Sequence, residues 1–144
     1  MTGLTLSVNA ASQTPDDNAV IEAFQSIPDL LANAPLLLER GKRLNVDCLL
    51  GPDVQPFHVT IRAGHIVDMT AAPVLMRSSE FSYRASTAAW REFWEPHPRA
   101  GWHDLLALTK RGEAILEGNL QPFMTHLQFF KDVLALPRHS GGKA

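Results

Sequence analysis

The order of the secondary-structure elements is set most clearly by residues 110–130, which read KRGEAILEGNLQPFMTHLQFF. Basic residues followed by Gly112 are typical of a helix end, because glycine tolerates positive φ and cations favour the last carbonyls. Residues 113–117 then predict a short strand. Gly118 and Asn119 follow, and the Asn119 side chain can cap a helix that begins beyond it. The stretch therefore predicts a helix, a strand and a second, apolar helix in that order.

The composition is that of an ordinary globular protein. A chain of 144 residues with 45% hydrophobic and 19% charged residues suits one domain with a single core. Lysine and arginine number 13 against 15 aspartates and glutamates, and the net charge of -2 makes nucleic acid an unexpected partner. The single cysteine, Cys48, lies in an apolar run and predicts a buried, inert thiol, which fits a reducing cytoplasm.

The two ends of the chain carry no targeting signal. The first residues, MTGLTLSVNA, lack a basic segment and an unbroken apolar stretch, and no later segment is apolar over a membrane span. We therefore expect a cytoplasmic protein without integral membrane association. Residues 1–15 predict a flexible arm and residues 137–144 a flexible tail, because both are rich in small and polar residues without periodicity.

The body of the chain separates helices from strands. Residues 16–40 predict two or three short helices, interrupted at Pro28 and Pro35. Alternating apolar and polar residues then predict strands. These strands are expected at residues 43–50, 57–62, 66–69 and 81–85. Such segregation predicts an α+β fold, with a mainly antiparallel five-stranded sheet covered on one face by helices and with extra N-terminal helices.

The same order of elements resembles the sterol carrier protein type two family, a group of small lipid-binding domains, over residues 41–136. The resemblance rests on the opening strands, the strand that leads into a helix, and the closing strand and apolar helix. Within the last of these, the positions that match the family pattern are Gly112, Gly118, Asn119 and Leu127.

Three features depart from the family pattern. The helices of residues 16–40 are additional, residues 95–103 look like an insertion, and the hairpin at Gly64 lacks the usual acidic residue. The resemblance implies a hydrophobic tunnel between the sheet and the helices. Such a tunnel accepts a fatty acid, an acyl-CoA, a sterol or a similar apolar molecule, and it involves neither a catalytic group nor a cofactor.

Apolar side chains of several elements are candidates for lining this tunnel. Methionine and phenylalanine suit an adaptable lining, because the thioether is flexible and the rings offer broad apolar faces. Helical spacing in the last helix is equally typical of an ordinary packed core, which would fill the tunnel. The candidates are Met69, Met76, Phe81, Trp90, Phe93, Trp94, Trp102, Phe123, Met124, Leu127 and Phe130.

Polar candidates are few. His97, His103 and Asp104 form the one close grouping, but two histidines on a proline-bounded loop lack the rigid frame of a zinc site, so no metal is expected. Asp104 is better explained as the N-cap of the next helix. His126 on the final helix can face solvent, be a satisfied core residue or orient a ligand head. The sequence also lacks nucleophile and phosphate-loop motifs, so no enzyme activity is expected.

The sequence is compatible with two functions. The first is an intracellular lipid-binding or lipid-carrier protein with its ligand between sheet and helices. The alternative is an accessory or dimerisation module whose tunnel is filled, and which pairs with itself or with an enzyme. The segment that holds all three tryptophans, residues 90–102, supplies either a lid over the ligand or the surface for that pairing.

Overall fold

The computed structural model describes residues 13–138 of the chain. The first helix within this range begins with a capping box. The Thr14 hydroxyl accepts a hydrogen bond from the Asp17 backbone N–H, and the Asp17 carboxylate accepts one from the Thr14 N–H, both at 3.0 Å. Thr14 therefore caps this helix in place of the acidic residues that follow it. The expected arm, apart from residues 13–15, and the expected tail, from residue 139 on, lie outside the described residues.

Within residues 13–138, three helices precede the sheet, and each has a proline at its first or second position, where a missing N–H costs nothing. The predicted breaks at Pro28 and Pro35 are thus helix starts. The three helices are α2 (Pro15–Gln25), α3 (Ile27–Ala32) and α4 (Pro35–Arg40).

Five strands form one sheet in the order β3-β2-β1-β4-β5. Only the central pair, β1 and β4, is parallel, and the other three pairs are antiparallel, which confirms the mainly antiparallel five-stranded sheet. The strands are β1 (Asn45–Pro52), β2 (Phe57–Arg62), β3 (His65–Ala71), β4 (Phe81–Ala85) and β5 (Ala114–Gly118).

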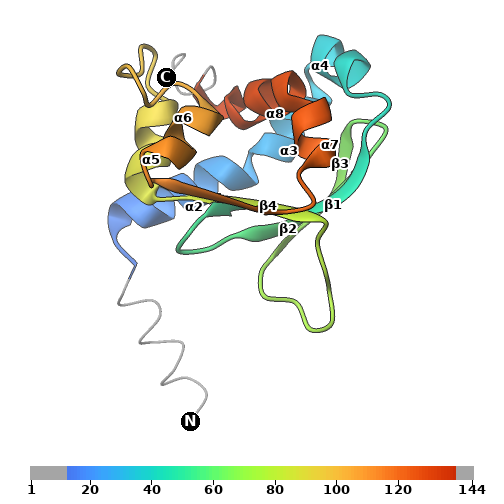
Figure 1. Cartoon of the computed structure of the whole chain (residues 1–144), viewed down its shortest axis with the longest axis horizontal. Coiled ribbons are helices and arrows are strands. Elements are labelled where there is room, and N and C mark those ends of the chain that lie inside the picture. The colour runs from blue at the N-terminus through green and yellow to red at the C-terminus, as the bar shows by residue number, and fades with distance from the viewer. Residues whose placement is uncertain (1–12, 139–144) are drawn as a thin grey trace.

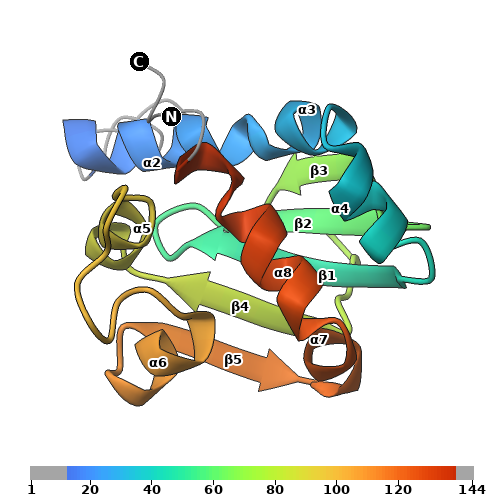
Figure 2. The same cartoon turned by 90° about the horizontal axis from the view of Figure 1, so that it is seen from above.

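The helices gather on one face of the sheet, as Figures 1 and 2 show from two directions. This confirms the α+β fold. After β4 come α5 (Thr87–Phe93), α6 (Leu105–Lys110), α7 (Gln121–Thr125) and α8 (Leu127–Leu134). Among the described residues, no helix has both the length and the apolar character to cross a bilayer.

The single apolar helix that the sequence predicts beyond Asn119 is in fact two helices, α7 and α8. The chain turns at His126, whose φ of -112° and ψ of 32° lie outside the helical region. This break shifts the buried stripe, because Phe123 is buried on α7 while Phe129 and Phe130 are buried on α8. Leu127, expected within the stripe, is only partly buried.

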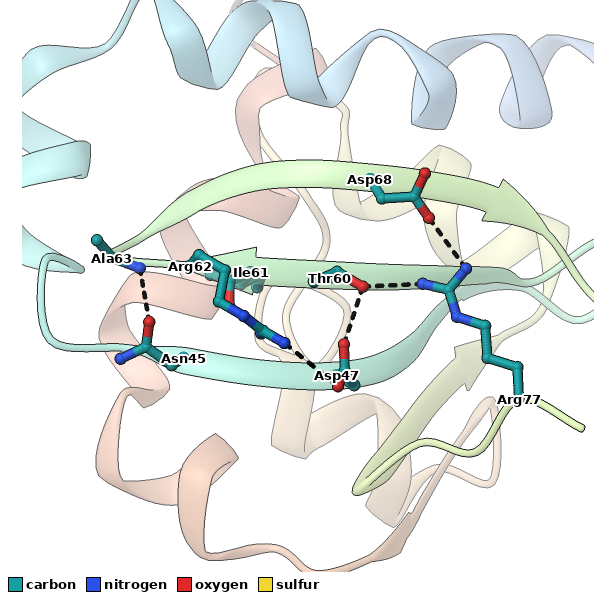
Figure 3. A network of polar contacts seen from close by, with 8 residues as sticks. All are labelled: Asn45, Asp47, Thr60, Ile61, Arg62, Ala63, Asp68 and Arg77. Atoms are coloured by element: carbon teal, nitrogen blue, oxygen red, sulfur yellow. Dashed lines mark hydrogen bonds and ion pairs between the residues drawn. The ribbon is translucent and has the colours of Figure 1, made fainter.

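The two faces of the sheet differ in chemistry. Apolar side chains such as Val46, Val59 and Tyr83 alternate toward the helices and are buried. The other face carries a polar network, drawn in Figure 3, in which Thr60 donates to Asp47 at 2.8 Å. Arg77 from the loop before β4 donates to Thr60 at 2.8 Å. The helical side is therefore the side on which an apolar ligand has apolar surroundings.

Candidate functional site

An aromatic cluster fills the layer between the sheet and the helices. Phe81 and Tyr83 rise from β4, and Phe123 from α7 stacks on Tyr83 with ring centroids 5.8 Å apart. Phe130 from α8 lies 5.3 Å from Phe123 and 5.5 Å from Phe81. The aromatic cluster, in full, consists of Phe24, Phe57, Phe81, Tyr83, Trp90, Phe93, Trp94, Phe123, Phe129 and Phe130.

Trp90 is the centre of the second half of this cluster. Its ring centroid lies 5.5 Å from that of Phe24 on α2 and 6.1 Å from that of Tyr83 on β4. Phe93 and Trp94, on the next turn, lie at 6.0 and 5.4 Å. Separations of about 4.5–7 Å are those of aromatic rings in contact. Side chains therefore occupy the predicted ligand space, and a ligand enters only where rings or helices move apart.

The structure brings together six of the eleven candidate side chains and separates the others. Those in the cluster are Phe81, Trp90, Phe93, Trp94, Phe123 and Phe130. Met69 on β3 and Leu127 on α8 pack partly buried at the margin of the core. Met124 is 47% exposed, and Met76 is 96% exposed on the loop before β4. Neither of these two methionines faces the layer between sheet and helices.

Trp102 also stands apart from the cluster. Its ring lies 4.8 Å from the guanidinium carbon of Arg99 and 4.5 Å from that of Arg111, so two cations cover it. The segment of the three tryptophans is consequently divided between the interior and a cationic surface.

All but one of the polar side-chain atoms in the cluster have a hydrogen-bond partner among the described residues. The Tyr83 hydroxyl donates to the Leu105 carbonyl at 2.6 Å, and burial raises the pKa of Tyr83, so the phenol stays neutral. Trp94 Nε1 donates to the Leu134 carbonyl at 2.7 Å. Trp90 Nε1 is buried, and no described residue accepts a hydrogen bond from it. One donor is therefore left over in an otherwise apolar interior.

A half-enclosed pocket of about 470 Å³ opens beside the cluster, where α4, α5 and α8 meet. Phe93 belongs to both the pocket and the cluster, so the pocket borders the packed aromatic interior. The apolar lining comes from Leu37, Phe93, Ala135 and Leu136, and the polar lining from His103, Asp104, Gln128, Lys131, Asp132 and Arg138.

Both carboxylates around the pocket form ion pairs with cations. Lys131 Nζ lies 2.5 Å from the Asp104 carboxylate, and Asp132 forms an ion pair with Arg40. Although burial opposes it, the hydrogen bond from Lys131 lowers the pKa of Asp104. Arg138 donates to the Phe93 carbonyl at 2.9 Å, and its guanidinium lies 5.0 Å from the Phe93 ring centroid. The polar rim therefore carries no uncompensated carboxylate.

Of the three polar residues grouped in the sequence, His97, His103 and Asp104, Asp104 has a structural role. The Asp104 carboxylate accepts from the backbone N–H groups of Leu106 and Ala107, which confirms it as the N-cap of α6. His97 and His103 are exposed. Within residues 13–138, no three His, Cys, Asp or Glu side chains stand together as a metal site would require. His126 is half-buried at the junction of α7 and α8.

Several pocket residues carry no sequence signal of a site. Leu37, Ala135 and Leu136 read as ordinary core residues, and Arg138 falls in the segment predicted to be a flexible tail. The pocket forms because α4 and α8 pack against each other, and this packing depends on long-range contacts that periodicity does not encode.

Comparison with known proteins gives matches to structures alone. No family model and no curated protein matches the sequence. A crystal structure of sterol carrier protein 2 matches with a TM-score of 0.62 and 16% identity, covering 81% of this chain and 94% of that one.

Two further solved structures agree. A conserved hypothetical protein from Thermus thermophilus, described as possibly a sterol carrier protein, matches with a TM-score of 0.55 and 16% identity over 81% of this chain and 86% of that one. A ubiquinone synthesis protein, UbiJ-SCP2, matches with a TM-score of 0.53 and 12% identity over 89% and 98%. The chain therefore has the fold of sterol carrier protein 2.

Proposed function

We propose that this protein binds a single-chain lipid or a sterol-like molecule and carries it in solution. The observation that carries the proposal is the position of Phe93, which forms both a wall of the open pocket and a part of the buried aromatic cluster. A ligand seated on Phe93 therefore contacts the edge of the aromatic cluster, and it goes deeper toward the sheet only where rings or helices move apart. The likeness of the fold to sterol carrier protein 2 supports this function.

The size and lining of the pocket fit a lipid. Its volume of about 470 Å³ falls within the roughly 300–1,000 Å³ of small-molecule sites, which are mostly apolar with a few polar groups. The apolar Leu37 and Leu136 face the same space as the charged rim. An amphipathic molecule can thus place its chain on the apolar wall and its head at the rim.

The charge balance of the rim narrows the ligand class. Lys131 is matched by Asp104, and the Arg138 guanidinium is committed to the Phe93 carbonyl and ring. The Phe93 carbonyl and ring do not neutralise Arg138, so the rim offers one positive charge, which suits a single carboxylate better than the several phosphates of acyl-CoA. The proposed ligand is therefore a fatty acid, fatty alcohol or sterol-like molecule, and the proposed activity is binding without chemical conversion.

Titration of delipidated protein with a fluorescent fatty acid tests the proposal. We expect saturable binding with one ligand per chain, displacement by unlabelled fatty acid or fatty alcohol, and a matching mass increase in native mass spectrometry. Absence of saturable binding and of co-purified lipid would refute lipid carriage. The filled, self-pairing module would then be tested by light scattering.

Two neighbouring leucines provide a matched pair of variants. Leu37 is partly buried and lines the pocket, whereas Leu36 is 82% exposed on the same helix. The Leu37→Trp substitution places a larger ring in the pocket and is expected to weaken fatty-acid binding. The Leu36→Trp substitution adds the same ring outside the pocket and should leave binding unchanged. Equal affinities for the two variants would place the ligand elsewhere.

A further inference from the structure

The loop between β3 and β4 exposes two large apolar side chains at its tip. It projects from the face of the sheet opposite the helices of residues 15–134, and Figure 1 shows it in yellow-green below the strands. Leu75 is 91% exposed and Met76 is 96% exposed, and they are adjacent in sequence. Single exposed apolar residues are common on proteins, but two neighbouring ones almost free of contacts indicate a binding surface.

Hydrogen bonds hold the stem of this loop against the sheet. Arg77 donates to Asp68 at 2.9 Å and to Thr60 at 2.8 Å, as drawn in Figure 3. On the other side of the stem, Gln55 Nε2 donates to the Ala72 carbonyl at 2.9 Å. Because both sides are anchored, the tip is held away from the sheet instead of folding back onto it.

The backbone at the tip of the loop also has an unusual conformation. Met76 has a φ of 62°, in the left-handed region that residues other than glycine rarely adopt. This conformation is unfavourable for a methionine, yet it is combined with nearly complete exposure of the side chain. The strained backbone therefore coincides with the most exposed apolar side chain of the loop.

We propose that this loop inserts Leu75 and Met76 into the surface of a lipid bilayer. The tip is convex, so a flat protein surface would cover only one side of it, whereas the acyl region of a bilayer surrounds an inserted projection. Residues 71–76 read AAPVLM and contain no charged residue, so the inserted part carries no charge into the lipid.

A pocket with a mixed apolar and polar lining lies between the loop and the sheet. It has a volume of about 360 Å³, and Pro73 in the loop, Pro56 in the β1–β2 turn and Leu49 in β1 contribute to its walls. Because the Arg84–Glu117 ion pair also lines this pocket, the proposed lipid contact is confined to the tip of the loop.

The charges near the loop define the type of membrane contact. Arg77 is paired with Asp68, and Arg84 is paired with Glu117 at 3.1 Å. Glu80, at the end of the loop, is exposed. Since paired cations attract anionic lipid only weakly, we expect the same affinity for neutral and anionic vesicles. The contact is apolar, in contrast to the electrostatic binding of a basic patch.

This inference goes beyond the proposed ligand site. The loop and the pocket beside Phe93 lie on opposite faces of the sheet, so vesicle binding and fatty-acid binding are separately measurable. A bilayer contact on the open face leaves the pocket on the helical side accessible. Loss of one activity therefore does not imply loss of the other.

A single-site fluorescent label tests the insertion. Cys48 is only 1% exposed, so the Met76→Cys variant accepts an environment-sensitive dye selectively at the loop. With neutral phosphatidylcholine vesicles we expect a blue shift and a gain in intensity. The same dye on Leu36→Cys, an exposed position on α4, is expected to show neither change. An unshifted Met76→Cys signal, or a shift that depends on protein concentration without vesicles, overturns the proposal.

A second experiment introduces negative charge at the tip of the loop and measures vesicle binding. The double substitution Leu75→Asp and Met76→Asp should reduce vesicle cosedimentation at least about tenfold, because both inserted side chains are lost. Fatty-acid titration of this variant should match that of the wild type. If the aspartate variant does not fold, the pair Leu75→Ser and Met76→Ser replaces it. Undiminished cosedimentation of a folded variant, or no cosedimentation of the wild type, contradicts bilayer insertion.

Discussion

Gly41 and Phe129 are in contact so close that no side chain fits between them. Gly41 ends α4, and the Phe129 ring on α8 lies where a Cβ atom of residue 41 would be, 2.6 Å from the ring carbon Cδ1. The opposite side of Gly41 receives the β2–β3 hairpin, where Gly64 has a φ of 82° and approaches the Gly41 carbonyl. One residue without a side chain thus joins α4, α8 and the hairpin.

The first prediction concerns this contact. Gly41→Ala forces the buried Phe129 ring to move within a packed core, and we expect the free energy of unfolding to fall by about 1–3 kcal/mol. Urea denaturation of both proteins measures the difference. In a double-mutant cycle, Phe129→Leu should cost less in the Gly41→Ala protein than in the wild type, because it relieves the clash. Additive effects would show that the strain lies elsewhere.

The second prediction concerns Asp17, whose carboxylate joins α2 to α5. The Thr87 hydroxyl donates to it at 2.6 Å, and this bond, followed by that from the Thr14 backbone N–H, lowers the pKa of Asp17 from its ordinary value of 3.8. A lowered carboxyl pKa contributes stability above about pH 4, and the contribution is lost as pH falls through the lowered pKa.

Replacing the Asp17 carboxylate by an amide measures its contribution to the free energy of unfolding. Asp17→Asn should cost about 1 kcal/mol near neutral pH, since an amide cannot accept both hydrogen bonds. The difference from wild type should shrink as the pH falls below about 4. Asp16→Asn is the control, because Asp16 makes only a surface pair with Arg91, and it should change stability by less than about 0.5 kcal/mol. A constant Asp17→Asn effect at all pH values would contradict the assignment.

The third prediction uses Cys48. Burial raises the pKa of this thiol, and the nearby charges of Asp47 and Glu80 raise it further. Because the thiolate is the reactive form, we expect the folded protein not to react with an aromatic disulfide reagent at neutral pH. Reaction should follow global unfolding in urea. Rapid reaction of the folded protein would show that β1 opens locally.

Local patterns in the sequence account for most of the fold. Alternation of apolar and polar residues locates the strands to within about two residues at each end, and Ser86, a residue type that favours helix N-caps, caps α5 through a 3.0 Å bond from the Ala89 N–H. The break at His126 has no such local signal. Without it, a straight helix would place Phe123 and Leu127 on one stripe, whereas the broken one buries Phe129.

The candidate site was less predictable for the same physical reason. Periodicity identifies apolar side chains that become buried, such as Trp90 and Phe130, but it does not distinguish rings in mutual contact from rings around a space. The pocket beside Phe93 depends on how α4 and α8 meet, and that arrangement is a tertiary property. Met124 shows the limit most directly, because a helical pattern assigned it to the interior and it is 47% exposed.

The fourth prediction follows from the position of Met124. Because its side chain is partly in solvent, Met124→Trp should neither fill a tunnel nor overpack the core, and stability should change by less than about 0.5 kcal/mol. Fatty-acid affinity should also stay the same. Phe130→Ala, on the following helix α8, should cost about 3–5 kcal/mol, because Phe130 is 1% exposed. A Met124→Trp protein with altered ligand binding would show that α7 moves when the ligand enters.

The last prediction concerns Trp90, whose indole N–H has no acceptor among the described residues. An unpaired buried donor is unfavourable, so Trp90→Phe removes that penalty while losing some packing, and the net change in stability should stay below about 1 kcal/mol. Because the proposed ligand keeps its head at the charged rim, we expect Trp90→Phe to change the affinity for a fatty alcohol and for the matching hydrocarbon equally, whereas a loss of about 3–10-fold for the alcohol alone, as expected for one hydrogen bond, would place the head at Trp90. Trp94→Phe is the control, since Trp94 Nε1 is already bonded to the Leu134 carbonyl and is not free for a ligand. Its effect should be equal for the two ligands. Equal effects of Trp90→Phe on alcohol and hydrocarbon would mean that the ligand head stays at the charged rim, beside Lys131 and Arg138, and that only the chain approaches the aromatic cluster.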